Sequence, residues 1–181
     1  KPYTIILNRP VFKPQLYALL AALGFSSVLN ENRVSEKLFD DYQFATQRLQ
    51  FAKAKNGAII LEDSSKATPF CTYWFLETVA KIRAQKKILV MTEMRPLTIN
   101  RNYFYEKLAS MTHFADMIYF LGPFEYWQKI ATIHKKVERI SVDDYPDITE
   151  HIIKQTDEES LILLKGSFRY RLDDLKKLLM Y

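Results

Sequence analysis

A run of polar residues follows the apolar segment 59–61. It begins at Asp63 and ends just before Pro69. Asp63 can accept hydrogen bonds from ribose hydroxyls or from a metal-bound water, and Ser64 or Lys66 can face phosphate oxygens. These residue types also start helices, because Ser and Thr cap first-turn N–H groups and proline is favoured at the first helical position. Both interpretations stay open: a helix cap, or a phosphate site at the positive end of a helix beginning at Pro69.

A second polar run follows the most apolar segment, 160–164. A lysine in the place of Lys165 either extends into solvent or meets a carboxylate or phosphate at the end of a strand. Gly166 allows the backbone to turn or a ligand to approach closely. Ser167 and Arg169 continue the run. The run is therefore a second candidate for binding an anionic group.

Glycine is scarce in this chain of 181 residues. The four glycines stand far apart, at Gly24, Gly57, Gly122 and Gly166. The sequence therefore has neither a glycine-rich phosphate loop nor a dinucleotide-binding fingerprint. The three histidines lack zinc-type spacing, and we interpret Cys71 as a buried helix residue rather than a nucleophile. We predict no catalytic residue and no metal ligand within the chain.

The charge balance permits an anionic partner without demanding one. The chain has 26 Lys and Arg against 21 Asp and Glu, a net charge of +5, and its basic residues are spread along its length. This pattern indicates a solvated surface and argues against a nucleic-acid partner. A single cysteine indicates a reducing compartment, and no apolar stretch has the length of a membrane span, so we predict a cytoplasmic protein. Because the sequence starts with Lys1, we expect a processed product or a piece of a longer chain.

Short apolar segments alternate with helical patterns from residue 58 onward. The alternation predicts an α/β fold, a Rossmann-like three-layer domain with a mostly parallel sheet and helices on both faces. Asn56-Gly57, between segments 47–53 and 58–62, predicts a β-hairpin with a type I′ turn. We expect strands at 58–62, 87–92, 116–121, 137–142 and 160–164, and helices at 69–85, 100–112, 124–134, 146–155 and 170–179.

The first part of the chain has a different character. Residues 3–7 predict a short strand, and an apolar stripe predicts a helix that begins at Pro14 and ends at Gly24. A more polar helix is expected at 31–41. We therefore divide the chain into a helical lead-in, residues 1–46, and an α/β domain, residues 47–181.

The predicted sheet places both candidate runs at one edge. In an open parallel sheet, ligands bind outside the carboxyl ends of the strands. The runs that begin at Asp63 and Lys165 both follow strands, as do Thr92, Glu93 and Arg95. We expect these side chains to meet at that edge, although the periodicity does not separate Glu93 and Arg95 from solvated loop charges.

The segment from Arg48 to Pro69, with its stretch Asp-Ser-Ser-Lys-Ala-Thr-Pro, resembles the start of the C-terminal domain of Mur ligases. These enzymes use ATP to add amino acids or D-alanyl-D-alanine to the peptidoglycan precursor. Lys165-Gly166-Ser167 is similar to the Lys-Gly-Ser stretch of the D-alanyl-D-alanine-adding branch. Order and spacing agree over residues 47–181, and residues 11–46 resemble the helices that end the family's central domain.

The resemblance implies a Rossmann-like domain that closes over ATP, with Mg²⁺ and most of the phosphate contacts supplied in cis by a central ATPase domain that this chain lacks. Its implied partners are a nucleotide-linked peptidoglycan precursor and an amino acid or dipeptide, joined through an acyl phosphate in a bacterial cytoplasm. The full-length protein would then be a ligase and this chain inactive alone. Implied nucleotide contacts are Arg48, Asp63, Ser64 and Lys66, and implied substrate contacts are Lys165, Gly166, Ser167 and Arg169.

Two alternatives stay open. Lys66 and Thr68 replace family asparagines, and Thr92-Glu93 replaces a family glycine, which favours a divergent, non-catalytic interaction module with the same fold. A receiver-like signalling domain is also compatible with Asp63, Thr92 and Lys165 at strand ends, although no strand end supplies the aspartate that would accept a phosphoryl group.

Overall fold

A computed structural model describes residues 13–29, 45–95 and 100–181. The chain divides into two compact units, Lys1–Phe44 and Ala45–Tyr181. In the first unit the described element is helix α1, Lys13–Leu29. The helix predicted from Pro14 is confirmed, but its predicted end at Gly24 is wrong, because Gly24 does not take the positive φ that ends helices. The elements predicted at 3–7 and 31–41 lie outside the described residues.

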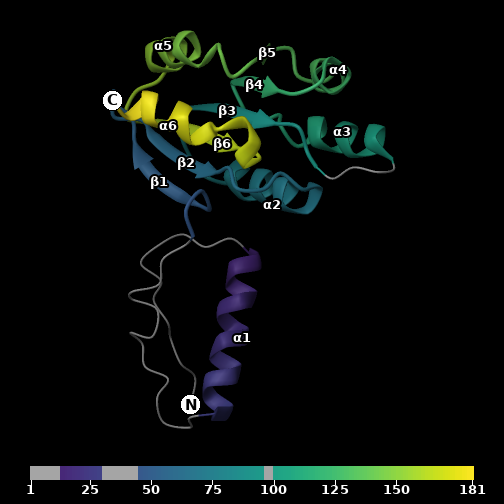
Figure 1. Cartoon of the computed structure of the whole chain (residues 1–181), viewed down its shortest axis with the longest axis vertical. Helices are drawn as coiled ribbons and strands as arrows, with labels where there is room; N and C mark the ends of the chain where they lie inside the picture. Colours follow the sequence, from purple (N-terminus) through teal and green to yellow (C-terminus); the bar gives the residue numbers. More distant parts are fainter. Residues whose placement is uncertain (1–12, 30–44, 96–99) are drawn as a thin grey trace. The chain divides into compact units, whose positions relative to one another are not determined.

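The second unit contains a six-stranded sheet in the order β1-β2-β6-β3-β4-β5 (Figure 1). Strand β1 pairs antiparallel with β2, and the remaining neighbours are parallel. The predicted Rossmann-like α/β fold is confirmed. The strands are β1 Gln50–Lys53, β2 Ile59–Asp63, β3 Lys86–Thr92, β4 Met117–Leu121, β5 Val137–Ile140 and β6 Ser160–Lys165.

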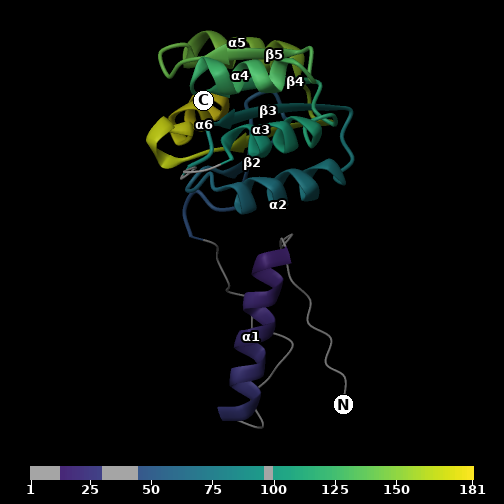
Figure 2. The same ribbon diagram turned by 90° about the vertical axis from the view of Figure 1, so that its right-hand side faces the viewer.

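Helices cover both faces of this sheet. The face that carries Ile88, Val90 and Ile162 is covered by α5 and α6. Alternate residues of the same strands face α2, α3 and α4, which succeed one another along the domain (Figure 2). The helices are α2 Pro69–Ala80, α3 Arg101–Ser110, α4 Phe124–Ala131, α5 Tyr145–Gln155 and α6 Leu172–Met180, with a 3₁₀ turn η1 at Phe168–Tyr170.

The hairpin between β1 and β2 forms as predicted, but its turn is of another type. Gly57 has a φ of 95°, whereas Asn56 is not among the residues with positive φ, so a type I′ turn is ruled out. The backbone N–H of Ala54 donates to the carbonyl of Ala58, which leaves a three-residue loop. The Asn56 side chain instead donates to the carbonyls of Ile153 and Thr156, at 3.0 and 2.8 Å.

Candidate functional site

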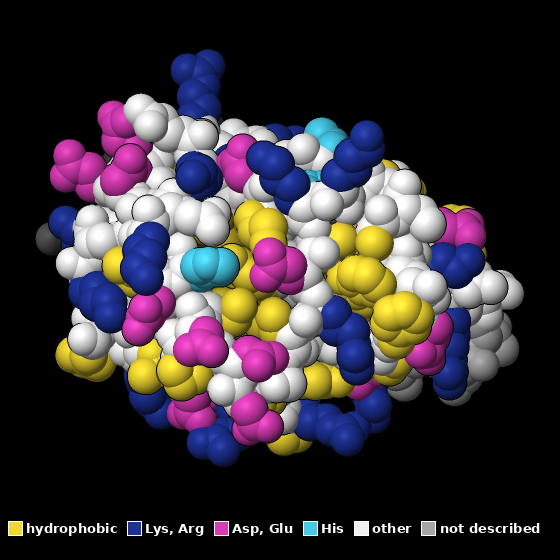
Figure 3. All heavy atoms as spheres, turned by 90° about the horizontal axis from the view of Figure 1, so that it is seen from above, with side chains coloured by type: hydrophobic (Ala, Val, Ile, Leu, Met, Phe, Trp, Pro, Cys, Tyr) yellow, Lys and Arg dark blue, Asp and Glu magenta, His cyan; other side chains and the backbone are white. Residues whose placement is uncertain are grey.

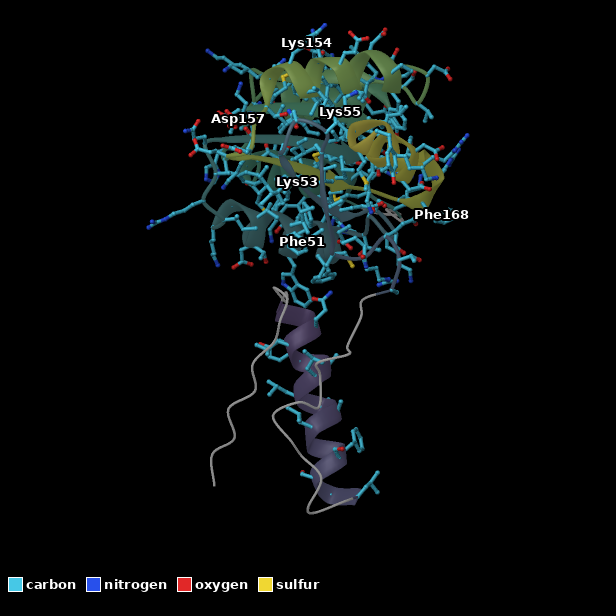
Figure 4. All side chains as sticks on the ribbon, turned by 90° about the vertical axis from the view of Figure 1, so that its left-hand side faces the viewer. Phe51, Lys53, Lys55, Lys154, Asp157 and Phe168 are labelled. Carbon is cyan, nitrogen blue, oxygen red and sulfur yellow. The ribbon has the colours of Figure 1, made fainter. Side chains whose placement is uncertain are left out.

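Three loops meet at the carboxyl edge of the sheet, after β2, β3 and β6. Strand β6 lies between the other two, and its Lys165 is in register with Asp63 of β2 and Met91 of β3. The two polar runs predicted from the sequence are therefore neighbours. The ends of β6 lie far apart: Asp157 precedes the strand and Phe168 follows it at the opposite side of the domain (Figure 4).

Lys165 is the buried centre of this edge. Its side chain is 1% exposed, and its ammonium donates to Asp63 Oδ2 at 2.6 Å, to the Asp63 carbonyl at 3.3 Å and to the Lys66 carbonyl at 2.8 Å. An ammonium has three N–H donors, so these three acceptors satisfy it. Of the two roles left open by the sequence, solvent exposure is excluded and contact with a carboxylate is observed.

The segment before β1 lies against the loop that follows Asp63. The carbonyl of Gln47 accepts from the backbone N–H groups of Ser64 and Ser65, at 2.9 and 3.1 Å. Gln47 and Leu49 both have positive φ, which is uncommon for residues with a Cβ. Arg48, between them, is exposed. It precedes β1 rather than starting it, and its neighbour Gln47 binds the loop that follows Asp63.

The side chain of Ser64 is bonded within the protein. Ser64 is 1% exposed, and its hydroxyl donates to Glu62 Oε1 at 2.5 Å. The other oxygen of Glu62 accepts from Lys176 of α6 at 2.8 Å. Lys66, in contrast, has an exposed side chain. In this conformation the polar side-chain groups of the loop without a hydrogen bond from the described residues include those of Ser65 and Lys66 and Oδ1 of Asp63.

The start of α2 confirms the predicted cap and corrects one prediction. Thr68 is the N-cap, its side chain accepts from the N–H of Cys71, and Pro69 is the first helical residue. Cys71 is exposed, not buried, since α2 also turns Phe70 and Trp74 towards solvent. The apolar residues of α2 extend beyond its covered side, so the apolar character of Cys71 does not indicate burial.

The end of β3 carries a carboxylate that has partners on two sides. Glu93, 5% exposed, accepts from Arg95 at 2.7 Å and from the Tyr170 hydroxyl at 2.5 Å. Burial, with the hydrogen bond to Glu93, raises the pKa of Tyr170 to about 12. The same carboxylate raises the pKa of Arg95 above its ordinary value. Tyr170 was missed from the sequence, where no motif or periodicity marks it.

Gly166 is required by packing. A Cβ on Gly166 would lie 2.5 Å from Cδ1 of Leu172 and 2.7 Å from Cγ2 of Thr92. Next to it, the N–H of Ser167 donates to the Thr92 hydroxyl at 3.1 Å. Arg169 lies on η1 and is exposed. Of the substrate contacts implied by the resemblance, Lys165 and Gly166 are thus buried, whereas Ser167 and Arg169 reach the surface.

The three loops present basic side chains to solvent and keep their acidic groups inside. Asp63 is 17% and Glu93 5% exposed, and each is ion-paired. A hollow of about 380 Å³ beside Glu93 is also lined by Arg95, Arg139 and Tyr170. By comparison, acidic and basic side chains intermix on the face over α4 and α5 (Figure 3). Between β2, β3 and β6 and the helices that follow them, the exposed charged residues of the described chain are Lys66, Arg95, Arg169 and Arg171, of which Arg95 pairs with Glu93 and Arg171 with Asp174.

Within residues 13–29, 45–95 and 100–181, no three His, Cys, Asp or Glu side chains are grouped to hold a metal ion. None of the helices in those same ranges combines the length and the apolar character needed to cross a membrane.

No family model and no curated protein matches the sequence. Solved structures do match. A MurF ligase from Thermotoga maritima in complex with ADP is 21% identical with a TM-score of 0.82, over 98% of this chain and 40% of that one. MurF from Acinetobacter baumannii is 19% identical with a TM-score of 0.75, over 94% and 38%. Folylpolyglutamate synthase from Thermotoga maritima is 15% identical with a TM-score of 0.61, over 97% and 40%.

The chain thus spans about two fifths of the length of the ligases it matches. At these identities the likeness concerns the fold, which agrees with the six-stranded sheet and with the resemblance drawn from the sequence. The α/β unit of this chain has the fold of the Rossmann-like C-terminal domain of Mur ligases.

Proposed function

We propose that this chain is the C-terminal domain, with a helical lead-in, of an ATP-dependent amide-bond ligase that acts on a nucleotide-linked peptidoglycan precursor. One observation carries the proposal: the loops after β2, β3 and β6 turn basic side chains outward and bury their acidic groups as ion pairs. Such an edge attracts a polyanion such as a nucleotide. The fold adds support, because a MurF with this fold was solved with ADP.

The residues at this edge fit part of a nucleotide. Arg48 and Lys66 are exposed, each next in sequence to a residue of the hydrogen bonds between Gln47 and Ser64–Ser65, and can neutralise phosphate oxygens. Asp63 keeps one carboxylate oxygen, Oδ1, without a hydrogen bond from the described residues, and a ribose hydroxyl can donate to it. Ser64 would shape the loop and leave the contacts to its neighbours, since its hydroxyl is bound to Glu62 and its N–H to the Gln47 carbonyl.

ATP, held with Mg²⁺ mainly by a central domain in cis, would supply the phosphoryl group that activates a carboxylate as an acyl phosphate for attack by an amine. We assign the metal to that other domain, as the resemblance to Mur ligases implies. The role of this chain is to close on the nucleotide, to neutralise charge with Arg48 and Lys66, and to exclude water.

The amino substrate is not chosen by the fold, since folylpolyglutamate synthase shares it. We propose Ser167 and Arg169 for direct contact with the incoming amino acid or dipeptide, because both reach the surface beside the edge. Arg169 would pair with a carboxylate of that substrate. Lys165 and Gly166, the other two residues of this stretch, are buried and act through their neighbours.

The decisive experiment compares two forms of the protein. The 181-residue chain alone should neither hydrolyse ATP nor ligate, whereas the protein expressed from its complete gene should join D-alanyl-D-alanine or an amino acid to the precursor, detected by mass. Arg48→Ala should reduce that turnover at least about tenfold, and Arg83→Ala, at the opposite edge of the sheet, should not. ATP hydrolysis by the chain alone would contradict the proposal.

One feature favours the alternative of a non-catalytic interaction module: the Ser64 hydroxyl and the Lys165 ammonium are both bound within the protein. That alternative predicts no ligation by the complete protein with any amine, although ADP binding could persist. The receiver-like alternative predicts labelling by acetyl phosphate. The end of β6, beside β2, carries Lys165, the end of β3, one strand further on, carries Thr92, and Asp63 is ion-paired, so we expect no labelling.

A further inference from the structure

The loop between Asp63 and Pro69 is held by three separate parts of the domain. Its start is fixed by the carbonyl of Gln47, which accepts from Ser64 and Ser65. Its end is fixed by Arg95, whose backbone N–H donates to the Ala67 carbonyl at 2.7 Å. Between these points the anchor is the ammonium of Lys165, which binds the Lys66 carbonyl at 2.8 Å.

Lys165 also fixes the position of the Asp63 backbone and side chain. Its ammonium binds both the carboxylate and the carbonyl of Asp63, and the N–H of Gly166 binds the same carbonyl at 3.2 Å. Only Oδ2 of the carboxylate is used by the lysine, and the Asp63 side chain is 17% exposed. The pairing therefore fixes one oxygen inside and leaves the other at the surface of the edge.

A direct contact between Lys165 and a ligand would require one of these bonds to break. The side chain is 1% exposed, the ring of Phe75 lies 5.7 Å from the ammonium, and three acceptors occupy its three donors. A compact ammonium suits this arrangement, because its donors point in three directions, whereas a guanidinium is a flat fork.

We propose that Lys165 is a positioning residue: it touches neither nucleotide nor amino substrate, and it holds the Asp63 loop so that Asp63 presents its outer oxygen to a ribose. The loop-holding part stands on the geometry alone, and the ribose part rests on the proposed function. The inference differs from the substrate contact that the sequence resemblance implied for Lys165.

The first experiment needs no ligand. In the 181-residue chain, Lys165→Met should speed amide hydrogen exchange at residues 64–67 by about tenfold or more, because the loop loses its central anchor. Lys87→Met is the matched control, since Lys87 is also a buried lysine, 8% exposed, but binds carbonyls of Val79 and Ala80. Unchanged exchange at 64–67 in Lys165→Met would overturn the inference. If Lys165→Met does not fold, the Asp63→Asn and Lys165→Met double variant removes both charges and carries the same test.

The second experiment uses the protein expressed from its complete gene and compares ADP with 2′,3′-dideoxy-ADP. The wild type should prefer ADP. Asp63→Asn and Lys165→Met should each lose that preference to the same extent, and the double variant should lose no more than either. Lys165→Arg should not restore it, because it keeps the charge without the three-way geometry.

The outcomes separate the two proposals. If the wild type does not bind ADP, the proposed function fails, and the exchange experiment alone decides whether Lys165 holds the loop. If the wild type prefers ADP and Lys165→Met retains the full preference, the positioning role is overturned while the proposed function stands. A Lys165→Met variant that keeps its ribose preference but has a raised KM for the amine would assign Lys165 to the amino substrate instead.

Discussion

Two buried lysines lie at opposite ends of neighbouring strands and behave differently. Lys165, at the carboxyl end of β6, pairs with Asp63 and binds the loop that leads into α2. Lys87, at the amino end of β3, donates to the carbonyls of Val79 and Ala80, where α2 ends. Lys87 thus satisfies the negative end of a helix, a structural task, whereas Lys165 organises a loop whose remaining polar groups face outward.

The largest effect we expect is on stability, and it should differ between the two lysines. Lys165→Met leaves the Asp63 carboxylate mostly buried without its partner, which should cost about 3 kcal/mol of unfolding free energy. Lys87→Met removes two hydrogen bonds to carbonyls and a contact with the Phe114 ring but breaks no direct ion pair, and should cost about 1–2 kcal/mol. Urea denaturation of the 181-residue chain measures both values. Equal losses would show that the ion pair with Asp63 adds nothing beyond the burial of a lysine.

Gly166, at the carboxyl edge of the sheet, and Gly57, at the amino edge, allow a second comparison of stability. Gly166→Ala should destabilise by about 2–3 kcal/mol, because the new methyl group meets Leu172 and Thr92 in a packed corner. Gly57→Ala at the hairpin has less crowding, with its nearest contact at 3.2 Å, but a φ of 95°, and should cost about 1–2 kcal/mol. Thermal unfolding ranks the two, and a Gly166→Ala variant as stable as wild type would contradict the packing that the structure describes.

Alkaline pH should change the stability contributed by Tyr170, at the carboxyl edge of the sheet, and by Lys87, at the amino edge, in opposite directions. The folded-state pKa of Tyr170 is raised to about 12, so the stability that Tyr170 contributes is present below pH 10 and is lost as the pH rises from 10 towards 12. Burial lowers the pKa of Lys87, partly offset by Asp116, so the unfolded chain binds the proton more tightly and stability rises as the pH approaches 10.5.

Single variants separate these two contributions to the pH dependence. Relative to Tyr170→Phe, the wild type should lose stability above pH 10. Relative to Lys87→Met, it should gain stability as the pH rises towards 10.5. Denaturation curves between pH 7 and 11.5 test both slopes, and slopes of the same sign would remove the contrast between the edges.

The smallest effect we expect is on the fluorescence anisotropy of a label attached to Cys71. Cys71 is exposed in the first turn of α2, so a fluorophore attached there should leave stability within about 0.5 kcal/mol of the unlabelled chain. Its anisotropy should fall in Lys165→Met, which frees the loop before α2. In Lys87→Met, which affects the far end of α2, it should stay constant. An equal change of anisotropy in both variants would mean that α2 moves as one rigid body, and that its two ends are not affected separately.

The architecture was predictable because each element has a local cause. Apolar strands alternate with helices, and Asn56-Gly57 marks the hairpin. The turn type was not predictable, since the Asn56 side chain bonds to carbonyls about a hundred residues later in the chain. The predicted end of α1 at Gly24 failed because a glycine ends a helix only when its φ becomes positive.

The candidate site was predictable as a location and less so as a set of roles. Strand ends place Asp63 and Lys165 together, because parallel strands share an edge. The partner of each side chain depends on contacts distant in sequence, such as Lys176 with Glu62, and these leave no local pattern. The role of Tyr170 could not be predicted from the sequence for the same reason, since its hydroxyl donates to Glu93, 77 residues earlier.

The crowded corner at Gly166 has a consequence for motifs. With Leu172 and Thr92 this close to the place of a Cβ on Gly166, any larger residue between the buried Lys165 and Ser167 would force these side chains to move. Sterics therefore account for the glycine of Lys-Gly-Ser, whatever the protein binds. The glycine marks how the ends of β3, β6 and α6 join, and ligand specificity has to be sought in exposed neighbours such as Ser167 and Arg169.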